Sequence, residues 1–589
     1  MYLFPDWDHA PFLHGVASAD PLYDRVLIWT RVSGYVANVS LGWRLWAVDE
    51  AQSFERPLQQ GADVALASSD FTLTVDVMNL HPGTRYAYQF SVGSNRSVLG
   101  YTKTASNSSQ VVLAVLSCSS LWSGYFGFYR KLASEDVDAV VHLGDLIYEK
   151  PDPDEMVRVP DIACDCAGEG AGSSVMHDME RVFCNRSDLE KYRALHSVHM
   201  SDPDFRLARS RHPFIAMYDN HDINWKDPEG SLRAWMEWVP MRVPGTRFAQ
   251  QPENGSFRSF RFGQDLVDII MLDTAFFASP SELLGEKQHA WFEAQLRAPP
   301  SLWRVIASPK TFMPMTLNKV GLALALPFAL VALVFLLWLA CCRGVMRICP
   351  RKTQRSTDEP DQKPSFVATL PHACARCCFR CACVVFWLWA VCAPTVCILL
   401  TLQFNSDSGL VLLDESQGNW EGHPASRALL FQQLHETGRD SNNIWVVGDM
   451  HYSYLADVFR FDPTVQDLLS YTPQSEVDRY GVEFMPGSGS RGNMDEKAGE
   501  VLGSLFQPGA ALTGFLTHLI DSVLQSSNPH LRHFEGSQHG YGVLRIAGQQ
   551  VQASWIRCEI LQVDGECSEV SGMYVQQNDN RWSFKASFP

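Results

Sequence analysis

The chain of 589 residues is long enough for roughly two to four domains, and its composition excludes several classes of protein. With 46% hydrophobic and 19% charged residues it is too apolar to be disordered, so it must form sizeable cores. The formal charge of −17 argues against a nucleic-acid scaffold, which needs a broad basic surface. The charge is also uneven, because residues 341–382 hold eight Lys or Arg against three Asp or Glu.

The N-terminal segment is typical of a β-sandwich. Short strands are predicted at residues 26–30, 71–77 and 80–90, separated by turns such as Pro82-Gly83. This spacing predicts a fibronectin- or immunoglobulin-like all-β domain over residues 1–105, in which a Tyr near a corner helps to fix a turn.

From residue 111 the pattern changes to that of a layered α/β domain. Continuous apolar strands are predicted at 111–116, 139–143, 214–218 and 444–447, with a helix at 127–136 after the first of them. Each strand ends in polar side chains that can bind metals. In α/β folds the site lies at the carboxyl ends of the strands, so we expect these side chains to meet.

Two long uncharged segments predict a membrane hairpin. Residues 320–342 and 381–406 contain no charge, and each is long enough to cross the hydrocarbon core as a helix. Their connector, 343–380, is rich in Lys and Arg and is therefore expected on the cytoplasmic side. We expect an integral membrane protein with the lipid bilayer as a partner and the catalytic domain extracellular or luminal. The alternative is a pair of helices buried in a soluble core.

Features near the start of the chain bear on the same question. Residues 1–15 show no secretory signal, which leaves a truncated N-terminus or an unusual insertion route as explanations. Five N-glycosylation sequons precede the first uncharged segment and agree with a glycoprotein whose large segments lie outside the cytosol. They begin at Asn38, Asn95, Asn107, Asn185 and Asn254.

Ten of the 16 cysteines lie between residues 341 and 397. S-palmitoylation is the favoured interpretation, and metal binding by four of them is the alternative. Those four are Cys374, Cys377, Cys378 and Cys381. Outside this segment, Cys558 and Cys567 can pair in a C-terminal hairpin. Two of three further cysteines can pair in a loop, namely two of Cys164, Cys166 and Cys184.

One set of residues follows the predicted strands in order and carries metal chemistry. It consists of Cys118, Asp145, Tyr148, Asn220, His221, Asp449 and His451. An Asp can bridge two ions, soft and phenolic donors favour a transition metal, and oxygen donors suit Ca²⁺ or Mn²⁺. The set therefore predicts a two-metal site.

These motifs resemble the PhoD-like (alkaline phosphatase D) branch of the calcineurin-like metallophosphoesterases. The N-terminal part resembles the family in FLHGVASADP at 12–21 and WTR at 29–31. The family's first metal motifs are resembled by SC at 117–118, GYF at 124–126 and HLGDLIYE at 142–149. Further segments follow in family order, namely DNHD at 219–222, LDT at 272–274, GDMH at 448–451, VEF at 482–484 and HGY at 539–541. Each motif alone is weak evidence for the family, but the order and spacing of the whole set are specific to it.

The resemblance implies a ligand set and a reaction. Cys118, Asp145 and Tyr148 are expected around an Fe³⁺-like ion, and Asp145 is expected to bridge to Ca²⁺. The remaining ligands would be Asn220, Asp449 and His451, and Mn²⁺ or Zn²⁺ are alternative ions. Asp145 and His221 are the expected catalytic residues, with His221 as proton donor or transition-state stabiliser. The expected activity is hydrolysis of small-molecule phosphate monoesters, diesters or both by attack of a metal-activated water.

The sequence also departs from the family pattern. Asn220 stands where Asp is usual, Ala275 stands where Arg is usual, and residues 319–404 form an insertion. These departures motivate the alternative of a catalytically inactive membrane glycoprotein that uses the fold for binding, and a soluble cytosolic enzyme is a third possibility. The expected domains are the sandwich (1–105), a metallophosphoesterase domain in two parts (106–318 and 405–589) and the inserted transmembrane hairpin (319–404). No protein partner can be deduced.

Overall fold

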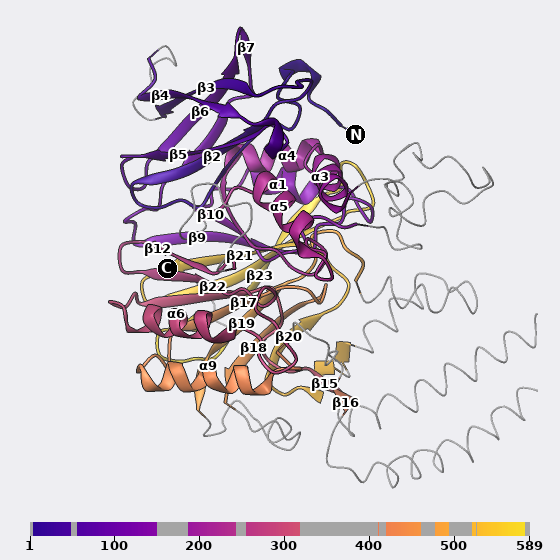
Figure 1. The fold of residues 1–589 in the computed structure, drawn as a ribbon. Helices are drawn as coiled ribbons and strands as arrows, with labels where there is room; N and C mark the ends of the chain where they lie inside the picture. The colour runs from indigo at the N-terminus through magenta and orange to yellow at the C-terminus, as the bar shows by residue number, and fades with distance from the viewer. Residues whose placement is uncertain are drawn as a thin grey trace, which may run out of the picture.

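The computed structural model describes residues 4–48, 56–149, 187–242, 255–317, 410–411, 420–460, 478–493 and 521–583, apart from residues 523 and 526. Two large mixed β-sheets lie face to face, helices cover their outer faces, and an N-terminal sandwich is joined to one edge (Figure 1). The fold class is thus a layered α/β arrangement with an all-β part at its start.

Among the described residues, the first large sheet has nine strands. Across the sheet they are β23 (Cys567–Gln576), β22 (Gln550–Cys558), β21 (His539–Ala547), β9 (Gln110–Leu116), β10 (Ala139–His142), β11 (Pro213–Ala216), β1 (Val16–Ala19), β2 (Arg25–Arg31) and β5 (Thr72–Met78). Strands β9, β10 and β11 are parallel, and β11 is also parallel to β1. The strands predicted at 111–116, 139–143 and 214–218 are therefore neighbours at the centre of one sheet.

The second large sheet has seven strands in the part of the chain that the structure describes. Their order is β12 (Arg258–Phe262), β13 (Val267–Met271), β14 (Trp303–Ser308), β17 (Asn443–Val447), β19 (Arg479–Pro486), β18 (Ser453–Phe459) and β20 (Leu531–Glu535). Strands β13, β14, β17 and β19 run parallel. Side chains such as Val115 and Val141 from the first sheet and Val305 and Val446 from the second share one buried core between the sheets. Because these strands are covered on both faces, they read as continuous apolar runs.

Helices cover the outer faces of both sheets. On the nine-stranded sheet they are α1 (Gly127–Ala133), α3 (Asp188–His199), α4 (Pro203–Arg211) and α5 (Pro228–Trp238), and on the seven-stranded sheet α6 (Gly285–Arg297) and α9 (Pro424–Glu436). Local sequence fixes where they begin. At the start of α3, for example, Ser187 and Glu190 form a reciprocal capping box, which satisfies free N–H groups of the first turn.

The N-terminal segment forms a sandwich that shares strands with the large sheet. Its own sheet contains β4 (Gln59–Ala65), β3 (Val39–Ala47), β6 (Arg85–Val92), β7 (Asn95–Arg96) and β8 (Gly100–Lys103), and it packs on β1, β2 and β5 around a separate core. The short elements are η1 (Trp7–His9), η2 (Ala67–Ser69), and the pair β15 (Thr316–Leu317) and β16 (Leu410–Val411). Tyr86 accepts a 2.8 Å hydrogen bond from the backbone N–H of His81. It is thus a tyrosine that helps to fix a corner, as the sandwich prediction expected.

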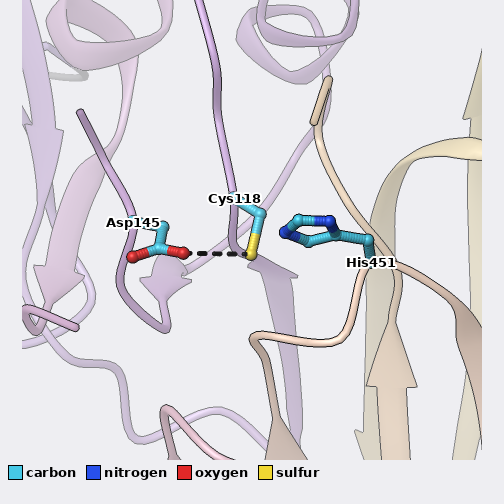
Figure 2. Close-up of side chains that lie close together, drawn as sticks. All are labelled: Cys118, Asp145 and His451. Carbon is cyan, nitrogen blue, oxygen red and sulfur yellow. Dashed lines mark hydrogen bonds between the residues drawn. The ribbon is translucent and has the colours of Figure 1, made fainter. Parts of the chain in front are cut away.

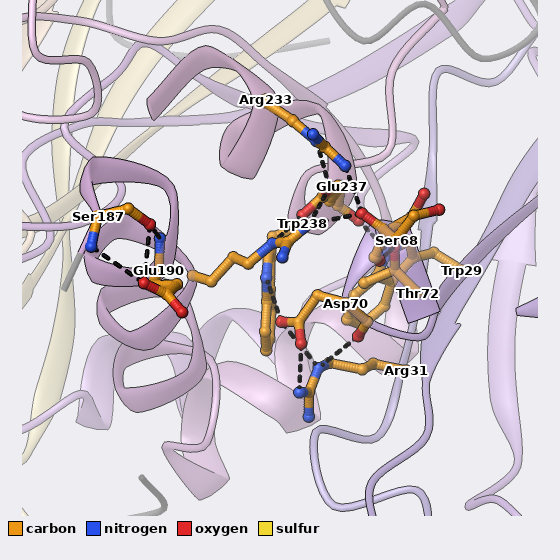
Figure 3. Close-up of polar contacts among 12 residues, drawn as sticks. Trp29, Arg31, Ser68, Asp70, Thr72, Ser187, Glu190, Arg233, Glu237 and Trp238 are labelled. Carbon is orange, nitrogen blue, oxygen red and sulfur yellow. Dashed lines mark hydrogen bonds and ion pairs between the residues drawn. The ribbon is translucent and has the colours of Figure 1, made fainter. Parts of the chain in front are cut away.

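Polar contacts join the sandwich to the helices on the nine-stranded sheet (Figure 3). Trp238 of α5 donates through Nε1 to Asp70 Oδ2 at 3.1 Å, and Asp70 also pairs with Arg31 at 2.8 Å. Trp29 of β2 donates through Nε1 to the Glu237 carbonyl at 2.9 Å. Such buried contacts hold the sandwich in one orientation on α5.

The predicted transmembrane hairpin, the integral membrane location and the lipid bilayer as partner are corrected by the structure. In the part of the chain that the structure describes, no helix is long and apolar enough to cross a membrane. The longest helices there, α6 and α9, have 13 residues, which gives about 20 Å against roughly 30 Å of hydrocarbon core. Hydropathy had suggested spans at residues 320–342 and 381–406, which lie outside the described residues. The predicted cysteine cluster at 374–381 and Cys164, Cys166 and Cys184 lie outside them as well.

Candidate metal centre

Loops after five parallel strands meet at one place. Cys118 follows β9, Asp145 follows β10, Lys310 follows β14 and Asp449 follows β17, while residues 219–222 follow β11. Four residues of this region adopt left-handed backbone conformations, with φ of 57° at Cys118, 53° at Asp145, 79° at Asp449 and 62° at His451. Non-glycine residues adopt such angles at a cost, and their clustering is typical of a functional site.

Asp145 lies at the centre of a group that contains a thiol, a phenol and an imidazole. Its Oδ2 accepts from Cys118 Sγ at 3.7 Å and from the Tyr148 hydroxyl at 3.0 Å, and that hydroxyl is 3.4 Å from His451 Nε2. Figure 2 shows Cys118 between the carboxylate of Asp145 and the ring of His451. Donor atoms of these three residues lie within 4.8 Å of one another. We call Cys118, Asp145, Tyr148 and His451 the thiol group.

The thiol group suits a cation. Cys118 and Tyr148 are fully buried, and burial raises the pKa of both side chains well above their ordinary values. The neighbouring Asp145 carboxylate adds to both shifts. Without a cation both would therefore keep their protons, whereas a metal ion stabilises the ionised forms that act as ligands.

A second group of donors shares Asp145 with the first. Carboxylate oxygens of Asp145, Asp219 and Asp449 lie within 4.8 Å of one another. The ammonium of Lys310 lies among them, 2.7 Å from Asn220 Oδ1, 2.6 Å from Asp449 Oδ1 and 2.9 Å from Asp219 Oδ2. We call Asp219, Asn220 and Asp449 the oxygen group.

Charges in the oxygen group strongly affect one another. Burial raises the pKa of Asp219 to about 8, and the ammonium of Lys310 opposes this rise. Burial by itself would lower the pKa of Lys310, but the carboxylates of Asp219, Asp449 and Asp145 outweigh it and raise that pKa. Lys310 is thus held as a cation. Oδ1 of Asp219 is buried and has no hydrogen-bond partner among the described residues.

His221 lies beside both groups. Its backbone N–H donates to Asp145 Oδ1 at 3.1 Å, its Nδ1 lies 2.8 Å from Glu149 Oε2, and its ring packs on Tyr148 with centroids 4.4 Å apart. Burial disfavours charge on this imidazole, but Asp145 and Glu149 outweigh it and raise the pKa of His221 to about 9. The side chain can therefore hold a proton at neutral pH.

Asp222 fixes the backbone that carries these side chains. Its carboxylate accepts from the N–H groups of Asp145 (2.7 Å), Leu146 (2.9 Å), Ile147 (3.1 Å) and Asp219 (2.9 Å). It therefore joins the loops after β10 and β11. Trp122 is buried and donates through Nε1 to the Tyr148 carbonyl at 2.9 Å.

The structure brings the candidate residues from the sequence into one region. Of the predicted metal ligands, Asn220 and Asp449 differ from Cys118, Tyr148 and His451 in that a side-chain oxygen of each accepts from Lys310. Sequence reasoning missed Asp219, Lys310 and Glu149 as members of the site. Asp219 and Glu149 stand beside predicted residues, and Lys310 follows a buried apolar strand in the same way as Cys118 does. Ala275 donates its N–H to Asp273 Oδ1 at 3.0 Å and packs against the core between the nine-stranded sheet and its covering helices.

Comparison with known proteins agrees with this geometry. A sequence profile of PhoD-like phosphatases matches residues 113–555, and a profile of the N-terminal domain of these phosphatases matches residues 4–106. The chain belongs to the PhoD-like phosphatase family. Alkaline phosphatase D of Bacillus subtilis (strain 168) is 27% identical over 348 residues, which cover 51% of this chain and 56% of that protein. The match thus spans a little over half the length of this curated relative.

A solved structure of PhoD shows the same fold. It aligns with 99% of this chain and 94% of its own, with a TM-score of 0.66 and 20% sequence identity. The resemblance found in the sequence motifs is therefore confirmed, and the PhoD-like family is metal-dependent. Nothing in these comparisons supports membrane attachment, glycosylation or the alternative of an inactive binding protein.

The two donor groups differ in how they fit metal ions. The thiol group joins soft, phenolic and imidazole donors to a carboxylate, which is a set that suits a transition metal. The oxygen group has the hard oxygen donors that Ca²⁺ prefers. However, the Lys310 ammonium is hydrogen-bonded to one oxygen of each of its three side chains. The thiol group fits a metal ion, and the oxygen group as arranged does not.

Proposed function

We propose that this protein is a metal-dependent phosphoric ester hydrolase that acts on small-molecule phosphate monoesters, diesters or both. The observation that carries the proposal is the pair of donor groups sharing Asp145 at the ends of parallel strands, in a member of a phosphatase family. Phosphate-ester hydrolysis is among the slowest uncatalysed reactions, so an enzyme for it needs strong stabilisation of negative charge.

The thiol group is the proposed site of an iron ion, with Cys118, Asp145, Tyr148 and His451 as ligands. A bound metal ion supplies Lewis-acid stabilisation of phosphoryl charge and lowers the pKa of a bound water. The family resemblance implies Ca²⁺ in the oxygen group, with Mn²⁺ or Zn²⁺ as alternatives, but the Lys310 ammonium occupies that group and the proposal places no ion there. Burial excludes bulk water from Cys118 and Tyr148, which strengthens every charge interaction in the group.

His221 is the proposed proton donor to the leaving group. Glu149 accepts from Nδ1, which fixes the orientation of the ring and leaves Nε2 for the substrate. Lys310 beside Asp449, and Arg491, whose guanidinium lies 4.7 Å from the centre of the Tyr148 ring, add positive charge close to the site. These cations matter because the chain as a whole has a charge of −17, which repels phosphate esters.

The division into a sandwich (1–105) and a phosphoesterase domain in two parts (106–318 and 405–589) completes the proposal. Strand pairing also joins the parts to one another. Strand β1 of the sandwich pairs with β11, and β21 of the C-terminal part pairs with β9. Strands from all three segments therefore contribute to the sheet that carries the site.

The test is an assay of purified protein with a nitrophenyl phosphate monoester and a bis-nitrophenyl diester, together with the metal content of the same sample. Asp145→Asn is expected to lower metal content and to reduce turnover at least a hundredfold, and His221→Ala to reduce turnover about 10²–10⁴-fold while metal content is kept. Asp227→Asn is the matched control, since Asp227 is exposed and makes no capping bond. Full turnover by Asp145→Asn would refute the assignment.

A further inference from the structure

Lys310 occupies the oxygen group as a cation would. An ammonium has three N–H donors, and here three acceptors face it from three side chains at hydrogen-bond distance, on Asp219, Asn220 and Asp449. The lysine is 9% exposed. Its charged end is therefore placed in the site and not at the surface, unlike most lysines.

The loop that carries Lys310 is held on both sides. Ser308 accepts from the backbone N–H of Lys310 at 3.2 Å and donates to its carbonyl at 2.8 Å, and Trp420 donates to the same hydroxyl at 3.1 Å. The carbonyl of Pro309 accepts from Gly448 N at 3.1 Å, which ties the loop to the one that carries Asp449. The backbone therefore delivers this side chain to one position.

Two residues later the loop is fixed again. Glu483 of β19 accepts from the N–H groups of Phe312 and Met313 at 2.8 and 2.9 Å. Tyr454 donates its hydroxyl to the same carboxylate at 2.6 Å. Glu483 is fully buried, so these bonds are not exchanged for water. The position of Lys310 thus depends on contacts that run through the centre of the seven-stranded sheet.

A divalent ion and the ammonium compete for the same oxygen atoms. Ca²⁺ takes six to eight oxygen ligands at 2.3–2.6 Å. One oxygen of each oxygen-group side chain already accepts from Lys310, and within the described part of the chain the buried oxygen left without a partner is Oδ1 of Asp219. A divalent ion bound to the same oxygen atoms would also lie close to the Lys310 ammonium, and two positive charges repel each other strongly in a buried site. A divalent ion could enter only if Lys310 withdrew and gave up three charge-assisted hydrogen bonds.

We propose that the Lys310 ammonium takes the place of a second metal ion, so that this protein uses one metal ion in the thiol group and a built-in cation in the oxygen group. This inference rests on the proposed function, because it concerns the same centre. It sets the protein apart from a two-metal phosphoesterase in a measurable way, because this centre would hold one metal ion and would not require Ca²⁺.

The experiment measures metal content by mass spectrometry, and melting temperature with and without added Ca²⁺, for wild type and Lys310→Met. Methionine keeps the length of the side chain and removes the charge. Wild type is expected to hold one transition-metal equivalent and to show no melting shift with Ca²⁺. Lys310→Met is expected to bind one additional divalent ion and to melt at higher temperature when Ca²⁺ is added. Lys103→Met is the control, because Lys103 pairs with Asp138 outside the centre, and it should match wild type.

Each result decides the inference. Wild type that binds Ca²⁺, or whose melting temperature rises with Ca²⁺ as that of Lys103→Met does, overturns the inference even if Lys310→Met fails to fold. A folded Lys310→Met that still binds one equivalent also overturns it. These outcomes leave the proposed function intact. Wild type without any metal and without turnover would instead refute the proposed function and this inference together.

Discussion

Replacement of Asp222 by Asn tests whether a buried carboxylate holds the site loops together. Each oxygen of Asp222 accepts two backbone N–H bonds. An amide can present only one oxygen, so whichever way it turns, two N–H groups face an NH₂ donor. A buried donor left without an acceptor costs about 1–3 kcal/mol, so two of them give a loss of roughly 2–6 kcal/mol. Because whole domains are stable by only about 5–15 kcal/mol, this loss is large.

The assay is thermal unfolding of Asp222→Asn, wild type and Asp227→Asn, followed by tryptophan fluorescence. For a chain of 589 residues the melting temperature shifts by roughly 1 °C per kcal/mol, so Asp222→Asn is expected to melt roughly 2–6 °C below wild type. Asp227→Asn should stay within about 0.5 kcal/mol, as expected for an exposed side chain without such bonds. The reasoning is refuted if Asp222→Asn melts within about 1 °C of wild type.

Three further predictions concern other parts of the structure. Tyr148→Phe removes the hydroxyl that lies 3.0 Å from Asp145 and should lower metal affinity about tenfold or more in chelator competition; unchanged affinity would remove Tyr148 from the ligand set. Burial raises the pKa of Glu483 from 4.5 to about 7, so its contribution to stability is complete below about pH 4.5 and is lost as pH rises to about 7. The stability of wild type relative to Glu483→Gln should therefore fall by about 3 kcal/mol between pH 4.5 and pH 8 in urea titrations, and a constant difference would contradict the shift. Reduction of the Cys558–Cys567 disulfide, which closes a short hairpin between β22 and β23, should cost roughly 3 kcal/mol, measured as a lower urea midpoint than in oxidised protein.

Sequence patterns predicted the parts of the structure in which local and global preferences agree. The apolar runs at 111–116, 139–143, 214–218 and 444–447 are strands because they are buried on both faces of two sheets, and such burial leaves a continuous apolar signature. The proposed ligands could be found because each follows such a strand. The Cys558–Cys567 pair was predicted from its hairpin spacing and is confirmed.

Other features could not be predicted because they depend on long-range packing. Lys310 follows β14, and whether it faces solvent or the site depends on Ser308, Trp420 and Glu483, of which the last two are more than 100 residues away. Hydropathy counts apolar residues and carries no information on their partners, which is why it predicted membrane spans that no described helix supports. Sequence reasoning is weakest where the role of a residue is set by what packs against it.

The N-terminal strands show how far such packing extends. The backbone N–H of Asp20, at the end of β1, donates to the Phe214 carbonyl of β11 at 3.0 Å. Its carboxylate pairs with Arg258 at 3.0 Å, and the same guanidinium donates to the Ala216 carbonyl at 2.6 Å. Because Asp20 and Arg258 are both buried, loss of either would leave an unpaired charge at the edge of β11. The loop that carries Asp219 and His221 begins one residue after Ala216, so the sandwich supports the proposed catalytic residues directly.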